Sequence, residues 1–287
     1  MIWGETLMKG KWENHTSHLV AGIPLIEQLL PEKQLMMIAG QFGVGKTMEL
    51  LHLMCCFSYG SRWHGLRVKP CVPIYITWEG TPEGIDKRKK IIETQYESLG
   101  LKFPWYIRMQ PKKISLNTPT GRDMLRNIVS ELSPKPNVIL LDPFKRTVQG
   151  NYSNPVVADD WIESANSLAQ EIGAAIITSN HTNKVIYRKD SPPDTLGSDK
   201  VKGAQDLLDG VAASILIAEE KGYKRVSRED GYAKTQWAHF STIIKVLKAR
   251  EATMEFPLLE VEFNRTLLRL FGEKWKVGVT AITKEKE

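Results

Sequence analysis

The sequence predicts an α/β protein with a mostly parallel sheet, helices on both faces, and antiparallel strands added at one edge by the C-terminal segment. From Leu19 to Ala218, apolar strand-like runs alternate with helical segments, which is the chain order of parallel βαβ units. The runs Asn137–Leu141 and Ala174–Ser179 are apolar throughout, as in strands buried on both faces of a parallel sheet. After Thr242, strand-like runs follow one another without an intervening helix, which favours antiparallel pairing.

The helices are predicted from apolar periodicity and from residues that begin or end helices. Thr118 is a good N-cap before Pro119, and Gly100 and Gly173 follow the last periodic residues of two helices. Helices are expected at Ile23–Leu30, Thr47–Tyr59, Thr81–Leu99, Thr118–Leu132 and Pro155–Ile172. Strands are expected at Leu35–Ala39, Pro73–Trp78, Trp105–Met109, Asn137–Leu141, Ala174–Ser179, Ala212–Ala218, Thr242–Ala249, Leu258–Phe263 and Leu267–Phe271.

Length and composition indicate one domain of an ordinary soluble protein. The 287 residues are 42% hydrophobic and 25% charged, with a net charge of +6 that permits a nucleic-acid partner without showing one. We expect an N-terminal arm at 1–18, the main domain at 19–272 and a C-terminal tail at 273–287. No signal peptide or membrane-length apolar run is evident, so a cytoplasmic location and no membrane partner are expected. Cys55, Cys56 and Cys71 form no C-x-x-C pair, which argues against a zinc site and for core thiols.

The segment from Gly40 to Thr47 matches the Walker A pattern of phosphate-binding loops. An apolar strand precedes it and a helix follows it, which is the context that the motif requires. Glycines let successive backbone N–H groups turn toward a phosphate, Lys46 reaches the β- and γ-phosphates, and the Thr47 hydroxyl is a Mg²⁺ ligand. The candidate nucleotide-binding residues are Gly40, Gln41, Phe42, Gly43, Val44, Gly45, Lys46, Thr47 and Met48.

Asp142 ends an apolar strand and fits the Walker B position. Its carboxylate would hold the Mg²⁺ together with Thr47, so ATP and Mg²⁺ are the expected cofactors. Pro143 follows Asp142, so the residue directly after it cannot be the general base.

Two further strand ends supply candidate catalytic groups. Glu79 follows a strand next to the loop helix and is the preferred general base, although Glu83 competes and a plain surface acid is an alternative. His181 ends another buried strand and can contact the γ-phosphate, or can simply cap the strand.

Together these features resemble the RecA-like ATPases, and most closely the hexameric replicative helicases of the plasmid RepA and DnaB kind. The resemblance runs from about Leu19 to Phe271. Three features narrow the resemblance beyond P-loop ATPases in general: Trp78-Glu79, the segment Ser179–Lys184 and Lys248-Ala-Arg250. It implies a RecA-like P-loop core.

The resemblance also implies roles for individual residues. Glu79 matches the catalytic glutamate and His181 the γ-phosphate sensor. Lys248 and Arg250 match a Lys-x-Arg pair that reaches the ATP site of the neighbouring subunit; by themselves they read as two exposed charges on an edge strand. Residues 1–18 are too few for the N-terminal domain of DnaB-type helicases, so primase binding is not expected. Residues 219–240 are interpreted as an insertion of unassigned role.

The resemblance places DNA contacts in the loops after the Walker B strand and the next strand. The expected DNA-binding residues are Lys145, Arg146, Lys184, Arg188, Lys189, Lys200 and Lys202. The alternative is a pair of solvated loops, because Asp190, Asp194 and Asp199 dilute the charge of the second one.

The function expected is an ATP-driven motor on single-stranded DNA. It would work as a homo-oligomeric ring, most simply a hexameric replicative helicase of a phage, plasmid or mobile element, with a loader or replisome protein as a further partner. A recombinase filament shares every ATP residue, and a regulatory ATP switch that binds a protein is a third reading. A small-molecule kinase fits less well, because no Arg-rich lid is evident.

Overall fold

A computed structural model describes residues 24–182, 201, 205–219, 240–249, 258–263 and 279–282. Its centre is a nine-stranded sheet in the order β3-β2-β4-β5-β1-β6-β7-β8-β9. The pairings from β3 to β6 are parallel, and β7, β8 and β9 join antiparallel, as the sequence predicts. The strands span Leu35–Gly40 (β1), Pro73–Thr77 (β2), Tyr106–Met109 (β3), Val138–Asp142 (β4), Ala175–His181 (β5), Ala213–Glu219 (β6), Phe240–Ala249 (β7), Leu258–Phe263 (β8) and Val279–Ile282 (β9).

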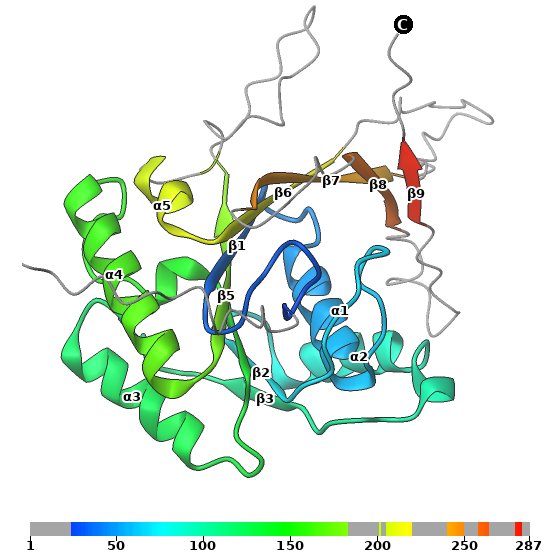
Figure 1. The fold of residues 1–287 in the computed structure, drawn as a ribbon, viewed down its shortest axis with the longest axis horizontal. Coiled ribbons are helices and arrows are strands. Elements are labelled where there is room, and N and C mark those ends of the chain that lie inside the picture. The colour runs from blue at the N-terminus through cyan, green and yellow to red at the C-terminus, as the bar shows by residue number, and fades with distance from the viewer. Residues whose placement is uncertain are drawn as a thin grey trace, which may run out of the picture.

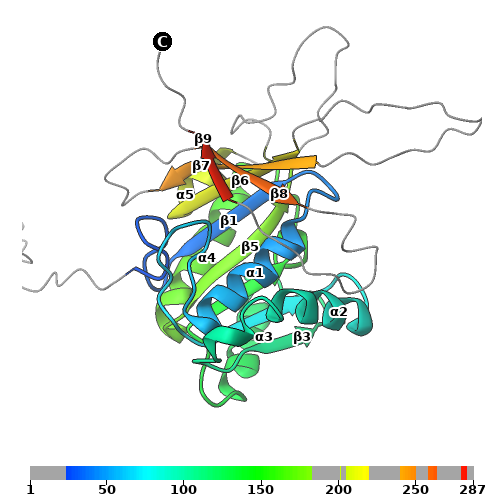
Figure 2. The same cartoon turned by 90° about the vertical axis from the view of Figure 1, so that its right-hand side faces the viewer.

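Helices cover both faces of the parallel part of the sheet (Figure 1). α1 (Lys46–Tyr59) and α2 (Pro82–Glu93) bury their apolar side chains against one face. α3 (Pro119–Ser130), α4 (Pro155–Ile172) and the short α5 (Gln205–Gly210) pack against the other face. β6 to β9 lie at the edge opposite β3 (Figure 2). Within the described part of the chain, no helix is long and apolar enough to cross a membrane.

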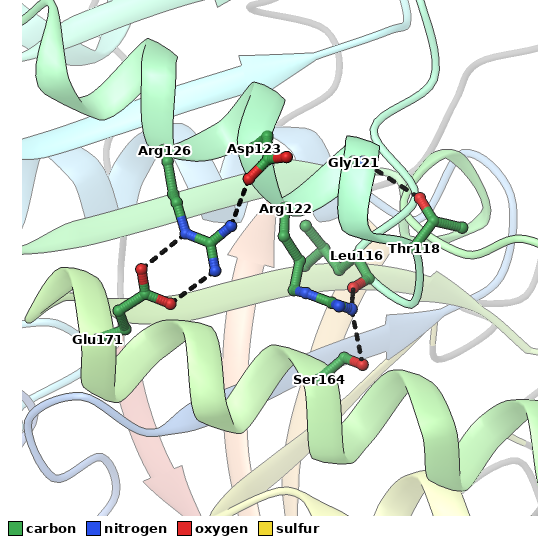
Figure 3. A network of polar contacts seen from close by, with 8 residues as sticks. All are labelled: Leu116, Thr118, Gly121, Arg122, Asp123, Arg126, Ser164 and Glu171. Carbon is green, nitrogen blue, oxygen red and sulfur yellow. Dashed lines mark hydrogen bonds and ion pairs between the residues drawn. The ribbon is translucent and has the colours of Figure 1, made fainter.

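Polar contacts hold α3 against α4 on the second face (Figure 3). Arg126 of α3 donates two hydrogen bonds of 2.7 Å to the carboxylate of Glu171 on α4 and one to Asp123. Thr118 caps α3 by accepting from the N–H of Gly121. A Cβ at Gly121 would lie 1.9 Å from the carbonyl oxygen of Ser115, so this approach of the helix to the preceding loop requires glycine.

Two predicted helices differ from the structure. Residues 24–30 form turns rather than a helix: Gln28 has a positive φ of 58°, and Ile26 bridges both Leu30 and Val68. So short a segment gains little as a helix, while its apolar side chains are buried equally well in the turn. The predicted Thr81–Leu99 helix ends at Glu93, and a 3-10 turn, η2 (Glu97–Leu99), follows it. The backbone N–H groups of residues 95 and 96 each donate to the carbonyl three residues earlier, a tighter turn than that of an α-helix. This turn redirects the chain and buries Tyr96.

Other differences lie at the C-terminal side. The sequence analysis missed α5, whose Leu207 and Leu208 are buried. The strand β9 lies within residues 273–287, which were expected to be a tail. The predicted strand Leu267–Phe271 lies outside the described residues.

Candidate functional site

The carboxyl ends of four neighbouring parallel strands form the candidate site. In sheet order β1, β5, β4 and β2, these strands lead to Gly40, His181, Asp142 and Glu79. The register places Gly40 opposite His181 and Thr77 opposite Asp142. Parallel strands present their carboxyl ends at one edge, so residues far apart in the chain converge there.

The loop between β1 and α1 has the backbone of a phosphate cradle. Gly43 and Gly45 adopt positive φ angles of 78° and 107°. A Cβ at Gly40 would lie 2.7 Å from the carbonyl oxygen of Ile217 on β6, so the strand end requires glycine as well. Val44 and Met48 are buried and anchor the loop in the core, while Phe42 is 90% exposed. The N-terminus of α1 follows directly, and its N–H groups favour an anion.

Lys46 is folded back onto this loop. Its ammonium group donates to the carbonyl oxygens of Gly40 (2.9 Å) and Gln41 (2.8 Å), and lies 3.3 Å from Nδ1 of His181. Burial lowers the pKa of Lys46 from its ordinary 10.5 to about 8, although the carboxylates of Asp142 and Glu79 oppose that change. The contact places His181 at the end of the lysine that the motif directs to the β- and γ-phosphates.

The carboxylate of Asp142 is buried and accepts hydrogen bonds from hydroxyl groups. Thr47 and Tyr75 each donate to Oδ2 at 2.7 Å, and Ser179 donates to Oδ1. The Thr47 hydroxyl and this carboxylate are hard oxygen donors held side by side, so the pair suits Mg²⁺, which would neutralise phosphate charge there. Tyr75 and Ser179 are not among the site residues predicted from the sequence. The pattern that marks them is a polar side-chain atom on an otherwise apolar strand, in a protein where another such strand ends in Asp142.

Glu79 lies just after the end of β2 and is partly exposed to solvent. The Thr77 hydroxyl accepts from the N–H of Glu79 and donates to its carbonyl, which fixes the turn. Partial burial and the charge of Asp142 raise the pKa of Glu79, while Lys46 and Arg146 act against that rise. A raised pKa makes a carboxylate a better proton acceptor, which fits the predicted general base. The competing Glu83 lies in the first turn of α2.

Basic side chains gather beside this edge. Lys145 and Arg146 are exposed on η3 (Phe144–Arg146), the turn that follows β4. The N–H of Ile114 donates to the carbonyl of Arg146, so Lys113, also exposed, comes next to them. Burial lowers the pKa of Lys113, and the charges of Arg146 and Lys145 lower it further. We call Lys113, Lys145 and Arg146 the basic cluster; the sequence analysis missed Lys113.

Lys248 lies away from the phosphate loop of its own chain. It pairs with Ser214 on β6, whereas Gly40 pairs with Ile217, three residues further along that strand. Its ammonium group donates to the carbonyl oxygens of Leu208 (3.0 Å) and Asp209 at the end of α5. The other predicted site residues, Arg250, Lys184, Arg188, Lys189, Lys200 and Lys202, lie outside the described residues.

Comparison with known proteins agrees with this geometry. A family model described as an AAA domain matches residues 7–185, which is more than half of the chain and includes Lys46, Glu79, Asp142 and His181. A search of curated proteins finds no match. The phosphate loop, the carboxylate that faces Thr47 and the family match together establish a nucleotide-dependent ATPase, and the chain belongs to the AAA-domain family.

Proposed function

We propose that the protein is an ATP-driven motor on single-stranded DNA that works as a hexameric ring, the replicative helicase of a phage, plasmid or other mobile element. The observation that carries the proposal is the basic cluster at the edge of the sheet that holds the ATPase residues. Exposed cations at that position suit the phosphates of a nucleic acid strand.

A second observation supplies a route from ATP to the DNA-facing loops. His181 contacts Lys46, and the next residue, Thr182, donates its N–H to the carbonyl of Gly40 at 3.2 Å. Thr182 also pairs with Val201, so both ends of the second loop expected to contact DNA are tied to the phosphate loop. Loss of the γ-phosphate would therefore change the contacts at the base of this loop.

The position of Lys248 is consistent with a ring. Since Lys248 lies away from its own phosphate loop, a role for it in hydrolysis requires the ATP site of a neighbouring subunit.

The test is ATP hydrolysis with and without single-stranded DNA, beside a Lys46→Ala control. We expect strong stimulation that falls with rising salt and is absent in the control. The double variant Lys113→Ala/Lys145→Ala should keep the DNA-free rate and lose most of the stimulation. Lys135→Ala is the matched control. It removes an exposed charge just before β4, where the amino ends of the parallel strands lie, away from the ATPase residues.

The outcome separates the rival readings. A Lys46-dependent rate that is indifferent to DNA contradicts the motor and favours an ATP switch acting on a partner protein. If DNA stimulates the rate, electron microscopy with a slowly hydrolysed ATP analogue distinguishes closed rings from a recombinase-like filament.

A further inference from the structure

A buried cluster of metal-binding side chains lies beside α1, outside the ATPase residues. Glu49, His52 and His64 are only 2%, 4% and 5% exposed, and one ligand atom of each lies within 4.8 Å of the others. Nε2 of His64 is 2.8 Å and Nδ1 of His52 is 3.6 Å from the same carboxylate oxygen of Glu49. Ligand atoms about 2.0–2.2 Å from one tetrahedral ion lie roughly 3.3–3.6 Å apart, so these atoms need little movement to share an ion.

The backbone holds His64 in an unfavourable conformation to bring it there. Trp63 and Leu66 exchange two backbone hydrogen bonds around a tight turn, with φ of 47° at His64 and 85° at Gly65. Asn, Asp or Gly usually takes this left-handed position. The imidazole instead enters the interior, where its side chain is fully buried and packs against the Trp63 ring. Strain of this kind occurs often at ligand-binding positions.

The helix contributes its donors from one stripe. Glu49, His52 and Cys56 are separated by three and four residues on α1 and therefore share a face. The thiol of Cys56 is buried one turn beyond His52, and it contacts the carbonyl of Arg62 at 3.4 Å and the hydroxyl of Tyr96 at 3.6 Å. The chain thus presents the pattern Glu-x₂-His-x₃-Cys-x₇-His, with three positions on a helix and one in a turn.

We propose that Glu49, His52 and His64 bind one Zn²⁺ ion. Cys56 lies outside this cluster of ligand atoms, and its thiol would lose its proton and move toward the ion as the fourth ligand. Imidazole nitrogen, carboxylate oxygen and thiolate sulfur are all donors that bind zinc, whereas Mg²⁺ and Ca²⁺ prefer oxygen. A bound cation would also compensate the charge of the Glu49 carboxylate, which is only 2% exposed. A zinc site here would differ from the sequence-based expectation, which rested on the lack of a C-x-x-C pair.

The ion would join two parts of the fold. Glu49 lies in the first turn of α1, where its N–H donates to the carbonyl of Gly45 in the phosphate loop. His64 belongs to the turn after the same helix. Zinc would therefore fasten the 61–66 turn to the start of the nucleotide-binding helix, as a structural rather than catalytic ion.

The first test is the metal content of the full chain, purified without chelator and measured by mass spectrometry. We expect about one zinc ion per chain and a lower melting temperature after chelation. Replacement with Co²⁺ should give the visible absorption bands of a four-coordinate site, with a near-ultraviolet thiolate band if Cys56 is a ligand. A chain that carries no zinc and shows no cobalt bands overturns the proposal and leaves a hydrogen-bonded Glu–His pair.

Variants then locate the ion. His64→Asn suits the left-handed turn while removing a ligand, and should weaken zinc binding by roughly 100-fold or more, measured by competition with a chelating dye. Cys56→Ser should abolish the thiolate band, whereas Cys55→Ser, at the adjacent and equally buried thiol, should leave it unchanged. Full zinc affinity in His64→Asn would place the ion elsewhere and contradict the assignment.

Discussion

The ammonium group of Lys46 lies 3.3 Å from the imidazole of His181, although 135 positions of the chain separate the two residues. The contact joins the lysine of the phosphate loop to the base of the loop that begins at Thr182. The contact makes His181 a candidate sensor of the γ-phosphate. Loss of its side chain should therefore affect hydrolysis and ATP binding to different extents.

Replacing His181 should slow hydrolysis more than it weakens binding. We expect His181→Ala to reduce turnover about 10- to 100-fold, because one donor to the transferring phosphoryl group is lost. His181→Gln, which keeps a donor, should retain more activity. Turnover is measured with saturating ATP, and affinity with a fluorescent ATP analogue; an unchanged turnover in His181→Ala would exclude the sensor role.

Glu79 should carry the proton-accepting step. Glu79→Gln keeps the size of the side chain but removes the base, so hydrolysis should fall about 100- to 10,000-fold while ATP still binds. Glu83→Gln is the control, because Glu83 lies in the first turn of α2. The two variants are compared by steady-state turnover. A larger loss in Glu83→Gln would assign the general base to Glu83 instead of Glu79.

ATP binding should consume a proton in alkaline solution. Free Lys46 has a pKa of about 8, and phosphates raise it by favouring the charged form. Above that pH the lysine must gain a proton to bind, so affinity should fall by up to about tenfold for each further pH unit. Calorimetry of Mg-ATP binding in two buffers of different ionisation enthalpy should show more proton uptake at pH 9 than at pH 7. Equal heats in both buffers at the higher pH would contradict the lowered pKa.

Arg250 should act across a subunit interface. Arg250→Ala is expected to abolish hydrolysis and leave ATP binding largely intact. Mixing it with the equally inactive Lys46→Ala chain should restore part of the activity, because some interfaces then combine an intact Lys46 with an intact Arg250. No recovery in mixed samples that exchange subunits would argue against action in trans.

Gly121→Ala should destabilise the fold without touching the nucleotide site. The added methyl would meet the carbonyl of Ser115, and overpacking of this kind costs about 1–3 kcal/mol. Gly84→Ala is the matched control in the first turn of α2, where the nearest atom is the Thr81 hydroxyl at 3.2 Å. Urea denaturation gives the free energy of unfolding of each variant. Equal midpoints would show that the start of α3 and Ser115 can move apart without loss of stability.

The sequence by itself determined the features that depend on local backbone chemistry. The glycine pattern from Gly40 to Thr47, the apolar strand that ends at Asp142 and the Thr118-Pro119 helix start each need only neighbouring residues, and the structure contains all three. The mostly parallel sheet followed in the same way from alternating periodicities.

Only the tertiary structure decided which side chains meet. Tyr75 and Ser179 donate to Asp142, and Lys113 joins Lys145, because strands and loops distant in the chain end at one edge of the sheet. His64 reaches Glu49 because a left-handed turn points it into the core, and the local sequence does not show which residue this turn brings it to. Contacts of this kind depend on strand order and turn geometry, which local sequence patterns leave open, since pairing across a sheet is set by the packing of the whole core.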